Sequence, residues 1–310
     1  MCGTASVAAA FAKAGYEVVA GDQLYFPCLH AKARLLFQDM NVFNELGMSY
    51  GDAINYLNGL PPIKGLFSKE YGEGGKPANG RPPRLYFSEE NAGRIDAVRA
   101  EVKELRKSGA NPMICDLLLH NLILAANQVA NISGTYGYFQ SRLSSASMKP
   151  LTLTASATAP LGRHEVLCGS VFETARVVEV DLLYLDPPYT KRQYAGNYHL
   201  PETIAREDTP SPVGDGGLRD WSSLASPFCY RKRALGSIEE VMKLSKARIV
   251  VWSYSSDGQV PLNLFQQKLT EFGAVEVRKS NLPRFRSNSG AQGGNVDEYL
   301  LICDRRGTNL

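Results

Sequence analysis

The sequence lacks the patterns that mark a metal site or a disulfide scaffold. Its 6 cysteines are scattered, and no two of them form a C-x-x-C pair. Its 4 histidines have no metal-ligand spacing either. The cysteines are Cys2, Cys28, Cys115, Cys168, Cys229 and Cys303. We therefore expect no bound metal and no disulfide framework.

Long apolar runs are missing as well. No stretch approaches the ~20 apolar residues that a membrane span requires, and the first residues lack the pattern of a signal peptide. The sequence thus predicts a protein of the reducing cytoplasm with no membrane partner. A net charge of +3 in 310 residues permits nucleic acid as a partner without demonstrating it. The length suits one large α/β domain with an insertion, or two domains.

One short stretch combines a buried strand with polar groups at its end. Apolar residues at 180–185 are followed by Asp186, Pro187, Pro188 and Tyr189. Prolines lack the N–H that a strand ladder needs, so the predicted strand ends there. Ligands of open α/β sheets bind just beyond the carboxyl ends of the strands. The stretch therefore places a carboxylate, rigid carbonyls and an aromatic ring at the expected ligand site.

The first residues resemble a nucleotide-binding loop in their order. Gly3, Thr4 and Ala5 precede a predicted helix capped by Ser6, and the next strand ends at Asp22. A glycine loop, a helix and a strand with a terminal acid form the pattern in which the acid holds a ribose. The match is weak, because the spacing is not G-x-G-x-x-G and small residues are common where helices start.

A strand is missing before this loop. A βαβ unit needs a strand ahead of its glycine loop, but only Met1 and Cys2 stand there. Either the true start lies upstream, or the protein has lost a first strand that would be central. The alternation of strands and helices predicts an α/β fold with a doubly wound, mostly parallel, Rossmann-like sheet and a largely helical insert. Residues 275–278 and 296–303 suit a terminal antiparallel pair with a basic loop between them.

The insert covers residues 41–160. Residues 47–84 are rich in Gly, Pro and Asn and are predicted to be loop, whereas helices are predicted from Ser88 and over 112–131. Two interpretations stay open: a helical insertion that packs on the core, and a substrate-recognition insert. Composition does not separate them.

The stretch at Asp186 has the chemistry of a clamp for an aromatic amine. The Asp186 carboxylate and the Pro187 carbonyl can accept the two amine hydrogens, which frees the nitrogen lone pair for alkylation. Tyr189 can stack on the base, worth roughly 1–3 kcal/mol, once the target has flipped out of its helix. No metal or strong general base is required. The alternative is a simple strand-ending turn, and the tetrapeptide alone does not decide.

Residues 186–199 resemble the signature of adenine-N6 DNA methyltransferases, in particular the Dam-like, FokI-type class of restriction–modification systems. Similar stretches occur along nearly the whole chain, among them 84–91, 134–137, 253–258 and 296–299. The resemblance implies a methyltransferase fold that binds S-adenosyl-L-methionine. It implies double-stranded DNA as partner and allows for a cognate restriction endonuclease. Residues 1–40 and 161–310 would form the catalytic domain, and 41–160 the DNA-binding target-recognition region.

Carried over residue by residue, the resemblance implies three groups of site residues. The target adenine is held by Asp186, Pro187, Pro188 and Tyr189. The cofactor lies against Gly3, Thr4, Ala5, Asp22, Ser170, Val171, Phe172 and Asp186. The residues implied to contact DNA are Arg192, Tyr194, Asn197, Arg219, Arg231 and Lys232. Further basic residues considered for phosphate contact include Arg84, Arg284 and Arg286. For any single one of these, a solvated surface position is the simpler interpretation.

Apart from Pro201, in a helix where Leu is usual, the departures from the family pattern lie on the cofactor side. Ala5 stands where a second glycine is usual, and Ser170 where a carboxylate often contacts the cofactor. These changes support an alternative, a catalytically impaired, N-terminally truncated remnant that only binds DNA. Methylation of another planar amine, in RNA or a protein glutamine, is disfavoured by the DNA-sized insert and by the residues after Tyr189. The leading hypothesis is methyl transfer to N6 of a flipped adenine in double-stranded DNA.

Overall fold

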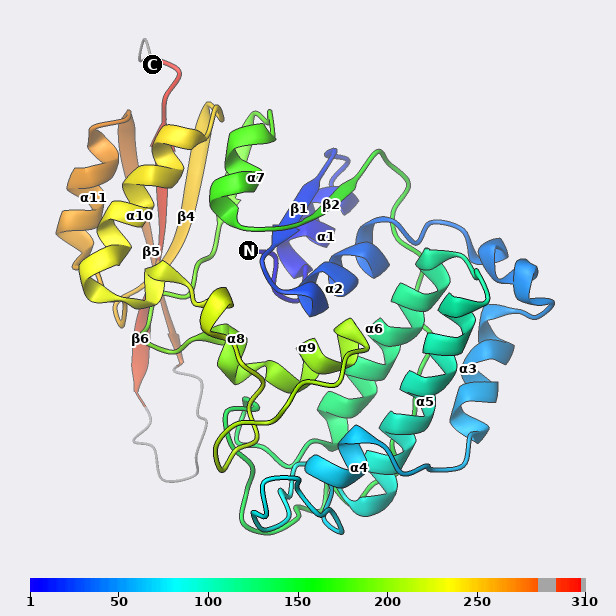
Figure 1. Ribbon diagram of the computed structural model, residues 1–310. Coiled ribbons are helices and arrows are strands. Elements are labelled where there is room, and N and C mark those ends of the chain that lie inside the picture. The colour runs from blue at the N-terminus through cyan, green and yellow to red at the C-terminus, as the bar shows by residue number, and fades with distance from the viewer. Residues whose placement is uncertain (284–293, 308–310) are drawn as a thin grey trace.

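The structure, a computed structural model, describes residues 1–283 and 294–307 and is mixed α/β (Figure 1). The basic loop predicted between the last two strands, with Arg284 and Arg286, lies outside the described residues. The strands are β1 (Val19–Asp22), β2 (Glu165–Cys168), β3 (Leu182–Leu185), β4 (Ile249–Ser255), β5 (Ala274–Pro283) and β6 (Asn295–Asp304). Among the described helices, none combines the length and apolarity that crossing a bilayer demands.

The helices divide into those outside the insert and those within it. Outside the insert lie α1 (Ser6–Lys13), α2 (Tyr25–Leu35), α7 (Val171–Val177), α8 (Tyr194–Asn197), α9 (His199–Arg206), α10 (Arg231–Leu244) and α11 (Leu262–Thr270). The insert contains α3 (Tyr50–Gly59), α4 (Leu66–Glu70), α5 (Glu89–Lys107) and α6 (Pro112–Val129). Short 3-10 turns are η1 (Met40–Leu46), η2 (Ser222–Leu224) and η3 (Pro227–Cys229).

The strands form two separate sheets. β1 pairs in parallel with β2, and Val19 lies opposite Glu165. The second sheet has the order β3-β4-β6-β5, in which β3 and β4 are parallel and β6 is antiparallel to both neighbours. The predicted mixed α/β class and the terminal antiparallel pair are confirmed. The sheet differs from the expected continuous, mostly parallel array, because no strand of the described residues pairs with the second edge of β1 or β3.

Helix starts in the insert follow the local sequence. α5 begins after Ser88, whose side chain accepts an N–H of the first turn, as predicted. α6 begins at Pro112, which suits a first position because it has no N–H to leave unpaired. α1 is different, since it begins at Ser6 without a side-chain cap, after Ala5 in the left-handed conformation with φ 59°. The predicted cap at Ser6 is therefore wrong.

The insert shares one hydrophobic core with helices that lie next to the sheets. This core joins apolar residues of α3, α5 and α6 to Leu29 of α2 and to Leu200 and Ile204 of α9. A second core lies between the four-stranded sheet and the helices α10 and α11, which cover one of its faces (Figure 1). Residues 41–160 thus pack directly on the elements that follow the two predicted site segments.

A buried ion pair anchors the long loop of the insert. Arg84 is fully buried, and its Nη1 donates to Glu70 Oε2 at 2.8 Å. The same guanidinium donates to the carbonyls of Asp215 at 3.0 Å and Gly214 at 3.3 Å. Its burial removes Arg84 from the basic residues considered for phosphate contact.

One pair of cysteines departs from the expectation. Cys28 of α2 and Cys168 at the end of β2 form a disulfide, with 6.2 Å between their Cα atoms. The two are 140 residues apart in sequence, and only the fold brings them together. The expectation of unpaired cysteines is therefore wrong for this pair.

Three histidines lie in the interior, which makes stability depend on pH. Burial lowers the pKa of His30 to about 4 and the pKa values of His120 and His199 to about 3. Below pH ~6.5 the unfolded chain takes up protons that the folded chain does not bind, so stability falls as the pH drops. The slope reaches ~1.4 kcal/mol per pH unit for each fully shifted histidine.

We expect the free energy of unfolding, measured by urea titration, to fall between about pH 7 and about pH 5.5, above the range of ordinary carboxyl groups. His120→Asn should flatten this slope, because Asn carries no titrating group and keeps a polar partner for His30, whose Nδ1 lies 2.7 Å from Nδ1 of His120. A slope that is the same in His120→Asn would contradict the assignment.

Candidate active site

The carboxyl ends of β3 and β4 meet at one edge of the four-stranded sheet, because the two strands are parallel. Their register brings Asp186, directly after Leu185, beside Ser253. Asp186 is exposed, whereas Pro187 and Pro188 behind it are buried. The predicted end of the strand at these prolines is confirmed, and the carboxylate faces solvent at that edge.

The surroundings of Asp186 change its acidity. Protein atoms around the carboxylate desolvate it in part and raise its pKa, although its side chain keeps contact with solvent. The nearby Ser253 hydroxyl and the positive amino group of Met1 oppose this rise. Ser253 thus lies beside the carboxylate and favours its charged form. The sequence assigned no role to Ser253, and only the strand register shows it.

Tyrosine rings border the carboxylate. The half-buried Tyr189 ring packs edge-on against Tyr254, with 5.9 Å between the ring centroids. The Tyr254 hydroxyl is fixed by the backbone of Val260, donating to its carbonyl at 2.9 Å and accepting its N–H at 2.8 Å. Tyr194 is 44% exposed. Protein atoms still desolvate it in part, and this desolvation, together with the nearby Tyr189 and Asp186, raises its pKa. A carboxylate beside aromatic surfaces suits a flat, polar ring.

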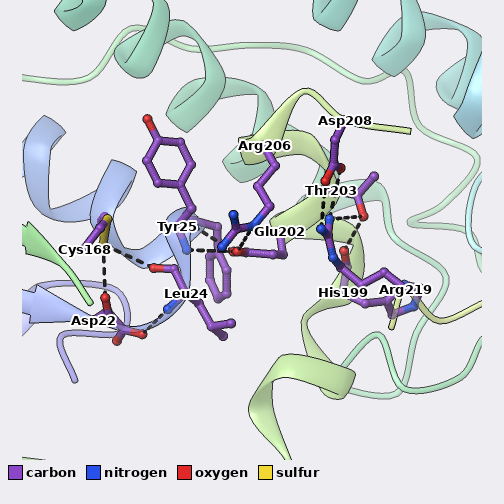
Figure 2. A network of polar contacts seen from close by, with 12 residues as sticks. Asp22, Leu24, Tyr25, Cys168, His199, Glu202, Thr203, Arg206, Asp208 and Arg219 are labelled. Carbon is purple, nitrogen blue, oxygen red and sulfur yellow. Dashed lines mark hydrogen bonds and ion pairs between the residues drawn. A yellow bond between two sulfur atoms is a disulfide. The ribbon is translucent and has the colours of Figure 1, made fainter. Parts of the chain in front are cut away.

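The N-terminal loop is organised by Asp22. Its carboxylate accepts hydrogen bonds from the N–H groups of Cys2 at 2.9 Å, Gly3 at 3.3 Å and Leu24 at 3.0 Å (Figure 2 shows the bond to Leu24). Gly3 has φ 51° and open space where a side chain would begin. Thus the acid at the strand end holds the loop, with about one of its four acceptor positions left for a ligand.

Ala5 and Thr4 point in different directions. Ala5 is fully buried with Ala12 and Ala20 in a small apolar cluster. Its methyl group therefore packs inward, and contact of Ala5 with a cofactor stays a prediction. Thr4 is exposed at the loop.

Ser170 follows β2 and is the N-cap of α7, and Val171 and Phe172 are the first residues of that helix. The Ser170 hydroxyl accepts the Phe172 N–H at 3.3 Å, and the Ser170 N–H donates to Glu173 at 3.1 Å. Ser170 is thus occupied as a helix cap. The Phe172 ring is half-buried and lies parallel to that of Phe228, with 6.0 Å between centroids.

Three of the basic residues predicted to contact DNA are exposed near the carboxyl edge. Arg231 and Lys232 begin α10, which precedes the parallel strand β4, so they lie at the edge where β4 ends. The Cys229 thiol donates to the carbonyl of Arg192 at 3.3 Å and joins the two segments. The fold therefore brings Arg192 to the same side as Arg231 and Lys232.

Arg219 and Asn197 already have partners in the protein. Arg219 donates to both carboxylate oxygens of Asp208, at 3.0 and 2.8 Å, and its side chain is 12% exposed (Figure 2). The backbone carbonyl of Asn197 accepts the Tyr136 N–H at 2.7 Å and holds the loop of residues 134–137. DNA contact by Arg219 would require the ion pair to break, so we leave Arg219 out of the DNA-contact surface.

Glu202 of α9 links the two halves of the site, and no sequence pattern pointed to it. Its buried carboxylate accepts the N–H groups of Tyr25 at 2.9 Å and Phe26 at 3.0 Å at the start of α2 (Figure 2). The residue before α2 provides no side-chain cap, so Glu202 supplies the anion that a helix N-terminus favours. Arg206 pairs with it. α2 follows Asp22, and α9 follows the 186–199 stretch. The contact between Glu202 and α2 therefore fixes the position of Asp22 relative to the 186–199 stretch.

Comparison with known proteins places these features in a family context. The model of the D12 class N6 adenine-specific DNA methyltransferase family matches residues 2–257. The chain is 31% identical over 268 residues to the type II methyltransferase M.NlaIII of Neisseria lactamica, covering 82% of this chain and 76% of that protein. It is 30% identical over 303 residues to the type II methyltransferase M.FokI of Planomicrobium okeanokoites, covering 94% of this chain and 46% of that protein. The chain thus spans about half the length of M.FokI. No solved structure gives a significant match.

We expect Glu202→Ala to lower the free energy of unfolding by about 3 kcal/mol, because buried N–H groups at the start of α2 lose a charged acceptor. Urea denaturation measures the loss. Glu104→Ala serves as the matched control, since Glu104 forms an exposed helical ion pair with Lys107 and such pairs contribute under ~1 kcal/mol. Equal losses in the two variants would show that Glu202 does not anchor α2.

Proposed function

The chain belongs to the D12 class N6 adenine-specific DNA methyltransferases, and from this premise we propose that Asp186, Pro187 and Tyr189 form its adenine pocket. The observation that carries the proposal is the exposed Asp186 carboxylate at the carboxyl edge, placed beside Ser253 by the strand register and close to the ring pair of Tyr189 and Tyr254. The function is site-specific methylation of N6 of adenine in double-stranded DNA.

The pocket residues act by accepting hydrogen bonds and by alignment. Asp186 and the Pro187 carbonyl accept the two hydrogens of the adenine amine, which localises the nitrogen lone pair for attack. The fixed φ of proline sets the direction of the carbonyl. Tyr189 stacks on the flipped base. The positive charge that develops on the nitrogen makes its proton acidic, and Asp186 lies where it can take that proton.

The cofactor side fits S-adenosyl-L-methionine through its loop and its acid. The exposed backbone at Gly3 and Thr4 leaves room for a ligand, and Asp22 keeps an acceptor position for ribose hydroxyls. Phe172 offers a half-buried ring to the adenine of the cofactor. The cofactor supplies the methyl group when bound. Ser170 contributes less, because its hydroxyl caps α7.

The two sheets are the halves of one doubly wound sheet. This proposal rests on the edges of β1 and β3 that no strand of the described residues covers. Residues 1–40 and 161–310 form the catalytic domain in this arrangement. Residues 41–160 serve as the target-recognition region, since they pack on α2 and α9 beside the site. Arg192, Arg231 and Lys232 contact DNA phosphates, and a cognate restriction endonuclease recognises the same DNA sequence.

We expect Asp186→Ala to lower methyl transfer to DNA at least roughly 100-fold, because the main acceptor for the adenine amine is removed. Transfer of a tritiated methyl group to DNA measures this. The fold should persist, since the raised pKa of Asp186 shows that its charge does not stabilise the folded chain. Activity within twofold of the parent would contradict the role of Asp186 as acceptor for the adenine amine.

Asp181→Asn provides the matched control for this test. Asp181 precedes the same strand at its other end, and its side chain is 88% exposed in an ion pair with Arg248. It should retain full activity. If Asp186→Ala loses activity while it stays folded, and Asp181→Asn keeps its activity, the parent chain is an active enzyme. A remnant that only binds DNA would show no activity to lose.

We expect Arg231→Gln with Lys232→Gln to weaken DNA binding and to reduce the slope of log affinity against log salt by about 2, because two phosphates are no longer neutralised by the protein. Fluorescence anisotropy with a DNA duplex measures both quantities. Arg163→Gln with Arg248→Gln is the control, because these arginines precede β2 and β4 at the opposite edge. The same drop in slope in both double variants would contradict a DNA-binding surface at the carboxyl edge.

A further inference from the structure

The disulfide between Cys28 and Cys168 lies beside the proposed cofactor loop. In the register of β1 with β2, Cys168 lies opposite Asp22, the acid that holds this loop. Figure 2 shows Cys168 beside Asp22 and Leu24. The next residue, Gly169, donates its N–H to the Asp22 carbonyl at 2.9 Å. A chemical change at this sulfur pair therefore acts directly on the position of Asp22.

The disulfide also joins elements that pack in different cores. Cys28 is in α2, which packs in the core shared with the insert. Cys168 lies three residues before α7, and Ala175 of α7 belongs to the core of the four-stranded sheet. The path from α2 through the two sulfur atoms to α7 is thus a short covalent link between the cores. Because Phe172 lies in the first turn of α7, this link sets the position of Phe172 relative to Asp22.

The two sulfur atoms differ in their access to solvent. Cys28 is fully buried, whereas Cys168 is exposed. A small thiolate in solution can therefore attack the sulfur of Cys168, and Cys28 is then the leaving group. Exposed disulfides are the ones that reducing agents open most readily, and they are often regulatory.

The surroundings of Cys28 also suit its reduced form. Its Sγ lies 3.2 Å from the carbonyl oxygen of Leu24, 3.6 Å from that of Asp22 and 3.7 Å from that of Leu167. A disulfide sulfur has no hydrogen to donate, so these oxygens can accept a hydrogen bond only from the free thiol. Both redox states thus find a fitting environment at the same place.

We propose that Cys28 and Cys168 form a reversible thiol–disulfide switch that acts on the cofactor side of the site. The disulfide fixes the spacing of Asp22 and Phe172, and reduction by a small thiol of the glutathione class loosens it. Proteins that act on DNA work in compartments kept reducing, where disulfides are usually transient, catalytic or redox-sensing. The effect on the cofactor rests on the proposed function of Asp22 and Phe172, whereas the effect on local structure does not.

The switch opens by two thiol–disulfide exchange steps. A small thiolate attacks the sulfur of Cys168 and forms a mixed disulfide there, and Cys28 leaves and takes up the proton that the small thiol released. A second small thiolate attacks the outer sulfur of the mixed disulfide, which frees Cys168 as a thiol and yields the small disulfide. Two electrons pass from two small thiols to the protein disulfide, and an excess of the small disulfide reverses both steps.

Peptide mapping by mass spectrometry tests the pair in the full chain. After equilibration with glutathione disulfide, followed by alkylation in denaturant, Cys28 and Cys168 should be found joined. After equilibration with reduced glutathione, both should be found alkylated. Free cysteines in both buffers would contradict the proposal, and so would a joined pair in both, because a structural disulfide resists the glutathione pool.

Reduction should loosen the segments around the sulfur pair. We expect Tm to fall by roughly 4 °C or more, because the unfolded chain loses a cross-link between residues 140 positions apart. Hydrogen exchange of the amides at 22–24 and 169–172 should become roughly tenfold faster. In calorimetry, S-adenosyl-L-methionine should bind roughly fivefold more weakly, because its contacts are no longer held in place before binding.

Cys168→Ser tests whether the sulfur pair carries these effects. The change replaces one exposed atom and leaves Cys28 with its carbonyl acceptors, so the variant should resemble the reduced parent in both buffers. Cys115→Ala is the matched control, since Cys115 is a free, buried thiol, and it should keep the full difference between the buffers. The proposal fails if the difference survives in Cys168→Ser, or if reduction of the parent changes neither Tm nor hydrogen exchange.

The calorimetry separates this inference from the proposed function. If S-adenosyl-L-methionine binds in neither redox state while Tm and hydrogen exchange still differ, the cofactor assignment is contradicted and the switch in local structure is supported. If the cofactor binds equally tightly in both states, the switch is overturned and the cofactor assignment stands.

Discussion

Parallel pairing of β3 with β4 is the constraint on which the proposed adenine pocket depends. It brings two carboxyl ends to one edge and sets Asp186 beside Ser253. The two prolines end the strand and are buried, so the chain turns there and leaves the carboxylate facing outward. Tyr189 is then placed by its contact with Tyr254 from the neighbouring strand. The pocket is thus built by backbone pairing more than by contacts among its own side chains.

Carboxylates that accept backbone N–H groups organise the other half of the site. Asp22 gathers the N-terminal loop, and Glu202 caps α2 from a distant part of the chain. A charged acceptor buried against N–H groups is costly to remove, so both acids constrain the loop strongly. Asp22 consequently holds the loop, and in the proposed function its last acceptor position serves a ligand.

The strand end at Asp186 could be predicted from sequence because the residues that mark it are contiguous. The run from Asp186 to Tyr189 carries a strand end, its terminator and its chemistry within a few positions. Glu202, Ser253 and the pairing of Cys28 with Cys168 could not be predicted, since each acts through a partner that only the fold brings near. The same holds for the basic residues, because sequence does not show that Arg219 is paired with Asp208.

The two halves of the site belong to different sheets, and this separation matters for the reaction. Methyl transfer requires donor and amine to be aligned within a fraction of an ångström. The loop at Gly3 depends on β1, whereas Asp186 depends on β3, and no strand of the described residues bridges them. The contact of Glu202 with α2 joins the two halves, and the core of the insert packs against both α2 and α9. Alignment of the proposed cofactor loop with Asp186 therefore depends on side-chain contacts, because no backbone pairing between described strands joins the two halves.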